Sequence, residues 1–135
     1  MPITLKKEIP GFVGNRLQKV FNDQAMYLVQ QGVIEPEDLD QLVTASLGLR
    51  WSTIGPFESR HLGGGPGGIR HLLDHVGSQM TFEIGSPDPA ANGPVIERFE
   101  QVYGIGVASY ERRTEQRDRL TRAVVAALET STDVD

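Results

Sequence analysis

The chain has 135 residues, the length of one domain with a hydrophobic core of its own, and its lack of cysteine excludes disulfide bonds and thiolate metal sites. A formal net charge of −5 with scattered lysines and arginines argues against a nucleic-acid surface or an anionic membrane, and no apolar run approaches the roughly 20 residues that span a bilayer. We therefore expect a soluble, cytoplasmic protein that binds no nucleic acid and no membrane.

The beginning of the chain predicts an extended segment and then a long helix. Residues 3–9 are short, partly alternating and β-branched, so they are typical of a strand or an extended lead-in, for which no pairing strand follows. The Pro10-Gly11 turn opens an amphipathic helix that carries one amide, Asn15, in its first turn and ends at Gly32. Asparagine is a poor helix-interior residue but offers both a hydrogen-bond donor and an acceptor. The apolar stripe consists of Phe12, Val13, Leu17, Val20, Phe21, Ala25, Leu28 and Val29.

Further helices are predicted along the rest of the chain. Pro36 begins a second helix with acidic residues in its first turn, and Gly48 is expected to end it. A short third helix follows Pro56, and residues 63–68 form a loop. The remaining expectations are a helix over 69–76 ended by Gly77, an irregular crossing over 78–93, helices over 95–103 and about 111–128, and a polar tail over 130–135 that frays.

The glycine-rich loop over 63–68 has two interpretations. Glycines ahead of a helix let backbone N–H groups approach a phosphate. A dinucleotide fingerprint, however, requires a preceding strand and a later acidic residue, and a phosphate-loop ATPase requires Gly-Lys-Ser/Thr, neither of which the chain has. We therefore favour a flexible connection between helices.

His71 and His75 stand four residues apart on a predicted helix, a spacing that can present two imidazoles to one zinc ion, and His61 lies near in sequence. The chain has no further ligand cluster beside Asp74, and no His-Glu-x-x-His motif. A serine hydrolase is disfavoured because there is no Gly-x-Ser-x-Gly elbow. We expect surface or cleft-lining histidines and no metal site.

Arg50 and Trp51 follow the predicted end of the second helix. An arginine there can interact with the last helical carbonyls while its stem covers apolar surface. Alternatively, its guanidinium grips a carboxylate or phosphate in a cleft. The residues alone leave both roles open.

Five segments together resemble, in order and spacing, the C-terminal domain of the 3-hydroxyacyl-CoA dehydrogenase family. The first is Ile9-Pro10-Gly11-Phe12-Val13-Gly14-Asn15-Arg16-Leu17-Gln18, where the family pattern is roughly Pro-Gly-Phe-x-x-Asn-Arg. The others lie at 28–34, 37–40, 47–51 and 54–58, and the similarity is strong over 9–77 and weak afterwards. Arg50 is similar to the branch that contains L-gulonate 3-dehydrogenase, also called lambda-crystallin. Substrates of that branch carry a free carboxylate, which favours the gripping role.

The resemblance implies an all-α helical bundle of about five to seven helices, like the C-terminal domain of 6-phosphogluconate dehydrogenase. It also implies a domain organisation: an extended lead-in over 1–9 that belongs to a missing Rossmann domain, the helical domain over 10–129, and a disordered tail over 130–135. In the complete family the Rossmann domain supplies NAD binding, a catalytic histidine with its glutamate partner and usually a substrate-binding serine. No histidine of this chain matches that catalytic histidine.

The resemblance implies residue roles as well. Asn15 matches the catalytic asparagine, and Arg50 and Trp51 would bind a small acidic or acyl-CoA substrate whose 3-hydroxyl is oxidised, as in fatty acid metabolism. NAD would come from a Rossmann domain in cis or in trans, and the helical domain would form a homodimer. Because sequential helices with a short connection pack antiparallel, Asn15 and Arg50 should open onto one cleft. The alternatives are a non-catalytic binding or assembly module with the same helical fold, and a cofactor-independent enzyme that uses the histidines.

Overall fold

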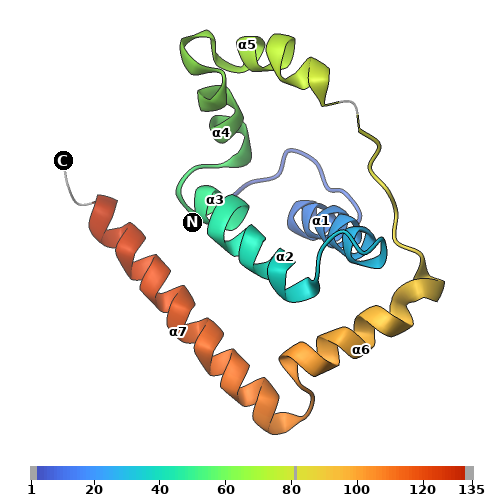
Figure 1. Cartoon of the computed structure of the whole chain (residues 1–135). Helices are drawn as coiled ribbons and strands as arrows, with labels where there is room; N and C mark the ends of the chain where they lie inside the picture. Colours follow the sequence, from blue (N-terminus) through green and yellow to red (C-terminus); the bar gives the residue numbers. More distant parts are fainter. Residues whose placement is uncertain (1–2, 81, 133–135) are drawn as a thin grey trace.

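The computed structural model describes residues 3–80 and 82–132 (Figure 1). Within these ranges the structure contains helices and no strand, which confirms the predicted all-α class. The α-helices are α1 (Val13–Gln30), α2 (Pro36–Val43), α3 (Leu49–Thr53), α4 (Pro56–Gly63), α5 (Gly68–His75), α6 (Asn92–Tyr103) and α7 (Val107–Thr132). Short helical segments lie at Thr44–Gly48, Gly65–Gly67, Gly77–Gln79 and Pro89–Ala91.

The turn before α1 has the conformation that its sequence predicts. Gly11 and Phe12 have φ angles of 83° and 54°, so the chain enters the helix through two left-handed residues. Phe12 N–H donates to the Ile9 carbonyl at 3.2 Å, and the Arg16 guanidinium donates to the Pro10 carbonyl at 3.4 Å. These bonds fix the direction in which α1 leaves the turn.

The lead-in over residues 3–9 is not part of a strand in the structure. A strand requires a neighbour that supplies hydrogen-bonding partners to its backbone, and no other strand is present within residues 3–80 and 82–132. The β-branched pattern of this segment therefore finds nothing to pair with in the described parts of this chain.

The prediction that Gly48 ends the second helix is wrong. α2, the π-helical segment Thr44–Gly48 and α3 form one continuous helical rod. Gly48 has a helical φ angle of −63°, and a Cβ atom there would lie 3.1 Å from the Val43 carbonyl oxygen. The missing side chain thus lets the wider π turn close instead of stopping the helix. Arg50 consequently lies inside α3, rather than beyond the end of a helix.

α4 and α5 pack on each other across the glycine-rich connection. The predicted loop at 63–68 is confirmed over 64–67, which form a tight turn with one 3₁₀ segment, whereas Gly63 ends α4 and Gly68 begins α5. A Cβ atom at Gly64 would lie 1.8 Å from the Gly68 carbonyl oxygen, so no larger residue fits. His61 Nδ1 accepts a hydrogen bond from the Ile69 N–H at 3.3 Å. The glycines therefore serve the close approach of two backbone segments.

The predicted irregular crossing is present between α5 and α6. We call residues 82–91 the crossing segment; it passes beside α1, where Gly85 lies so close to the Tyr27 ring that a Cβ atom would be 2.2 Å from it. The Gln30 amide donates to the Asp88 carbonyl and to Asn92 Oδ1, and its oxygen accepts from the Asp88 N–H, each at 2.8 Å. The two bonds to Asp88 fasten the crossing segment to the end of α1, and the third joins Gln30 to the first residue of α6.

α7 is longer than the sequence predicts and stands apart from the other helices (Figure 1). It continues to Thr132, so residues 130–132 of the predicted tail are helical, and 133–135 lie outside the described residues. In the described part of the chain the buried side chains are those of Val95 on α6, which is 6% exposed, and Pro36 at the start of α2. No helix found there combines the length and hydrophobicity needed to cross a membrane.

Candidate functional site

Asn15 lies exposed in the first turn of α1, as predicted. Its position is fixed by the left-handed turn at Gly11 and Phe12, which sets where the helix starts. The side chain makes no hydrogen bond within residues 3–80 and 82–132, and it does not cap the helix. Both its donor and its acceptor are therefore available to a ligand.

Arg50 and Trp51 lie on α3, and both are exposed. The ends of this helix are satisfied by other side chains: Ser52 Oγ donates to the Leu49 carbonyl at 2.7 Å, and Thr53 Oγ1 donates to the Arg50 carbonyl at 2.8 Å. The Arg50 guanidinium has no hydrogen-bond or ion-pair partner in the described part of the chain. The role of Arg50 in capping the helix, one of its two interpretations, is thus taken by hydroxyl groups.

A largely apolar groove runs between α1 and the α2–α3 rod, with a volume of about 390 Å³. It is lined on one side by α1 and on the other by the rod, and the five-residue connection of residues 31–35 reverses the chain between them. We call it the α1/α2 groove; its lining residues are Phe21, Gln24, Ala25, Leu28, Val33, Ile34, Leu39, Leu42, Val43 and Leu47. Asn15, Arg50 and Trp51 do not line it, and no hydrogen bond joins their side chains.

The histidines serve local structure. The rings of His71 and His75 stack with centroids 4.1 Å apart, and His75 Nδ1 lies 3.0 Å from the His71 carbonyl oxygen. His61 holds the start of α5 through its bond to Ile69. Across residues 3–80 and 82–132, no group of three or more histidine, cysteine or acidic side chains gathers as a metal site would require.

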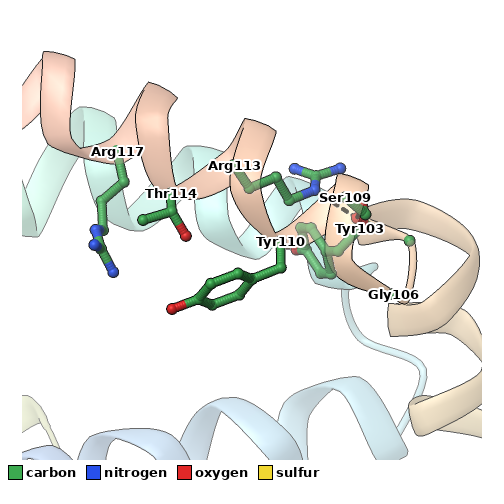
Figure 2. Close-up of a pocket in the computed structure, with 8 residues that line it drawn as sticks. Tyr103, Gly106, Ser109, Tyr110, Arg113, Thr114 and Arg117 are labelled. Atoms are coloured by element: carbon green, nitrogen blue, oxygen red, sulfur yellow. Dashed lines mark hydrogen bonds between the residues drawn. The ribbon is translucent and has the colours of Figure 1, made fainter.

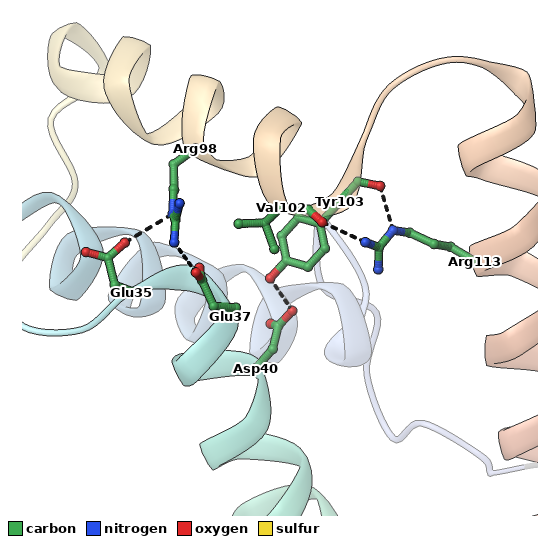
Figure 3. Close-up of polar contacts among 7 residues, drawn as sticks. All are labelled: Glu35, Glu37, Asp40, Arg98, Val102, Tyr103 and Arg113. Carbon is green, nitrogen blue, oxygen red and sulfur yellow. Dashed lines mark hydrogen bonds and ion pairs between the residues drawn. The ribbon is translucent and has the colours of Figure 1, made fainter.

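A polar network that sequence reasoning missed joins α6 to α2 and α7 (Figure 3). Arg98 on α6 pairs with Glu35 at 3.3 Å and also with Glu37 in the first turn of α2. Tyr103, at the end of α6, donates to Asp40 Oδ2 at 2.6 Å. The acidic residues of α2 were predicted to favour the helix dipole, and the structure shows that they also bind α6.

The same network raises the pKa of Tyr103 to about 12. Partial burial of the phenol is the main cause, followed by its hydrogen bond to Asp40 and the negative charge of that carboxylate. Tyr103 therefore stays neutral at physiological pH and acts as a hydrogen-bond donor, not as a general base.

The corner between α6 and α7 is closed by arginine. The Arg113 guanidinium donates to the carbonyls of Tyr103 at 2.6 Å and Val102 at 2.7 Å, and it lies over the Tyr103 ring, 5.0 Å from its centroid. A hollow of about 330 Å³ lies beside this corner, where Tyr110, Thr114 and Arg117 project from one side of α7 (Figure 2). Because Arg113 is occupied by the carbonyls and Arg117 pairs with Asp118 at 2.7 Å, the hollow offers no free guanidinium.

Comparison with known proteins identifies relatives. Residues 11–98 match the family model described as 3-hydroxyacyl-CoA dehydrogenase, C-terminal domain. An L-carnitine dehydrogenase from Nocardiopsis dassonvillei is 37% identical over 134 residues, covering 94% of this chain and 40% of the relative. The lambda-crystallin homolog of Rattus norvegicus is 35% identical over 102 residues, covering 74% of this chain and 31% of the relative.

A 3-hydroxyacyl-CoA dehydrogenase from Gibberella moniliformis is 45% identical over 78 residues, covering 56% of this chain and 24% of the relative. The chain thus spans at most about two fifths of the length of these relatives. The match to the L-carnitine dehydrogenase extends over nearly the whole chain, well beyond residues 9–77, where the similarity of the sequence pattern is strongest.

Proposed function

Because the chain belongs to the 3-hydroxyacyl-CoA dehydrogenase C-terminal domain family, we propose that it is the substrate-binding and dimer-forming domain of an NAD-dependent 3-hydroxy acid dehydrogenase. In the complete enzyme a Rossmann domain, in cis or in trans, binds NAD, which accepts a hydride from C3 of the substrate. A histidine of that domain takes the hydroxyl proton as the 3-keto group forms.

In this proposal, Asn15 orients the substrate hydroxyl or the histidine, and Arg50 holds the acidic end of the substrate. The observation that carries the proposal is that both side chains are exposed and unbonded in the described structure. The α1/α2 groove supports a common site: Asn15 stands six residues before Phe21 on α1, and Arg50 stands three residues after Leu47 on the rod. In antiparallel helices these positions lie beyond the same end of the groove.

We propose a free 3-hydroxy acid, and not a thioester, as the substrate. The relative that matches 94% of this chain is named for L-carnitine, a compound with a 3-hydroxyl and a free carboxylate. A planar guanidinium such as Arg50 binds a carboxylate with two parallel hydrogen bonds, which makes it suited to this end of the molecule. Trp51, 46% exposed beside it, would provide an apolar wall.

A chimeric enzyme tests the proposed function. The chain would replace the corresponding C-terminal segment of the Nocardiopsis dassonvillei L-carnitine dehydrogenase, and NADH formation would be followed with L-carnitine and other 3-hydroxy acids. We expect a chimera that binds NAD and oxidises a free 3-hydroxy acid in preference to its CoA thioester. A folded chimera that binds NAD but oxidises none of these compounds would favour a non-catalytic assembly module instead.

A further inference from the structure

The α7 helix is attached to the rest of the chain at one end. Ser109 and Arg113, in its first two turns, bond the carbonyls at the end of α6. Beyond this corner α7 stands apart from the other helices (Figure 1). At 26 residues, or roughly 39 Å, it is the longest element of the fold.

One side of α7 is an exposed apolar stripe. Leu120, Val124 and Leu128 recur every four residues and therefore share a face, and all three are exposed. In folded proteins a helix is stabilised mainly by packing of its amphipathic face, not by intrinsic propensity. The stripe therefore requires a covering partner.

The exposed area of the chain indicates the size of what is missing. A folded monomer of 14.8 kDa exposes about 7,000 Å². This chain exposes 11445 Å², an excess of about 4,400 Å² over that scaling. Each copy in a large homodimer buries roughly 1,000–2,500 Å². The excess is thus enough for one extensive dimer interface and for a second neighbour, such as a Rossmann domain.

The α1/α2 groove is the complementary surface. Its lining is almost entirely apolar, and Leu42 at its edge is 54% exposed. Gln24 Oε1 is buried there without a hydrogen-bond partner in the described part of the chain, so an incoming donor would satisfy it. The groove can therefore bind an apolar helix face, and Gln24 Oε1 can accept one hydrogen bond from it.

The charges of the two surfaces are complementary. α7 carries the five arginines Arg112, Arg113, Arg117, Arg119 and Arg122 and four acidic residues, of which only Glu115 and Asp118 lie between the arginines. α2 and the glutamate before it carry Glu35, Glu37, Asp38 and Asp40 and no basic residue. Asp38, Arg119 and Arg122 have no ion-pair partner within residues 3–80 and 82–132. Opposite charges of this kind set the orientation in which two surfaces associate.

We propose that α7 is an exchanged arm: its Leu120–Val124–Leu128 stripe lies in the α1/α2 groove of a second copy of this chain. A two-fold axis makes the exchange reciprocal, so each copy gives one arm and receives one. This inference rests on the dimer-forming part of the proposed function and specifies the surfaces that meet.

A matched pair of substitutions tests the stripe. Val124 and Val125 are adjacent and equally exposed, 48% and 47%, but Val125 is turned by about 100° away from the stripe. We expect Val124→Asp to raise the dissociation constant of the dimer at least about 30-fold in sedimentation equilibrium, because it places a charge in the apolar interface. Val125→Asp should leave the constant within about threefold. Equal effects of the two variants would overturn the proposal.

Disulfide trapping tests the partner surface independently of folding effects. The chain has no cysteine, so single cysteines can be introduced without background. Val124→Cys chains mixed with Leu42→Cys chains should form a heterodimeric disulfide on mild oxidation, whereas Val125→Cys should not replace Val124→Cys. Exclusive formation of Val124→Cys homodimers would show that α7 pairs with α7 and would overturn the arm exchange.

The outcomes separate this inference from the proposed function. If Val124→Asp leaves the dissociation constant of the dimer unchanged, the arm exchange is contradicted, but the chain still forms a dimer. A chain that is monomeric at about 100 µM contradicts both the exchange and the dimer. An active chimera with either result would leave the catalytic part of the proposed function standing.

Discussion

Substrate recognition is tested most directly at the Arg50 guanidinium. The hydroxyls of Ser52 and Thr53 already bond the carbonyls of α3, so replacing Arg50 removes no helix cap. In the chimera we expect Arg50→Ala to raise the KM for a free 3-hydroxy acid by about 10- to 100-fold, the value of a hydrogen bond to a charged group, with kcat changed little. Steady-state kinetics measures both. Arg60→Ala, an exposed arginine on α4, is the control, and an unchanged KM for Arg50→Ala would remove the gripping role.

The raised pKa of Tyr103 predicts how the stability of the fold changes at alkaline pH. Its pKa is raised from 10.0 to about 12 in the folded chain by burial and by Asp40. Between these values the unfolded chain releases the phenol proton while the folded chain keeps it, so stability should be fully present below about pH 10 and fall as the pH rises toward 12. The measurement is the free energy of unfolding from urea titrations between pH 9 and 12. In the Tyr103→Phe variant this free energy should decrease less with pH than in the wild type, whereas the Tyr110→Phe variant should behave like the wild type.

At this scale the sequence predicts some roles and hides others. Asn15 is recognisable because its position beside Pro10-Gly11 is a local pattern. The pairs of Arg98 with Glu37 and of Tyr103 with Asp40 are separated by 61 and 63 residues, so no local spacing reveals them. Such pairs become visible only when packing brings α6 against α2.

Among the elements, the crossing segment depends on one side chain. Gln30→Ala removes three hydrogen bonds and leaves the polar backbone of Asp88 to water. We expect the free energy of unfolding to fall by about 1–3 kcal/mol. Gln31→Ala, the exposed next residue whose side chain makes no described bond, should cost less than about 0.5 kcal/mol. Chemical denaturation that finds the two variants equal would show that Gln30 does not hold the crossing segment.

Helix positions follow well from the sequence, and their ends follow less well. The apolar period and the Pro36 and Pro56 starts predict α1, α2 and α4 correctly. Gly48 was expected to stop a helix, but the π turn uses its missing Cβ to continue. A glycine is compatible with both outcomes, and only the backbone around it decides which occurs.

For the whole molecule, the proposal divides the chemistry between two domains. The glycine-rich turn at 63–68 is preceded by the helix α4 and not by a strand, so it lacks the strand–turn–helix arrangement that binds the pyrophosphate in a dinucleotide fold. We therefore expect the chain by itself to bind NAD negligibly. Calorimetry at about 100 µM protein would show this, and binding with a micromolar Kd would contradict it.

The open shape of the molecule is what the sequence could predict least. The apolar stripes of α1 and α7 are visible in the sequence and suggest a covered face, but they do not show which neighbour covers it. In the structure the α7 stripe and the first half of the α1 stripe remain exposed, and among the described residues only the side chains of Val95 and Pro36 are buried. The exposed apolar surfaces therefore require neighbouring domains or chains to cover them. The proposed site lies on the same exposed surface.

The central claim is that this domain takes part in the reaction and does not merely support the cofactor domain. The measurement that tests it most directly is the kcat of the chimera with Asn15→Ala against that with Gln18→Ala, an exposed residue on the same helix. Loss of an orienting amide should lower kcat by about 10- to 100-fold with KM nearly unchanged, because the amide acts in the transition state. A kcat for Asn15→Ala equal to that of Gln18→Ala would contradict the account.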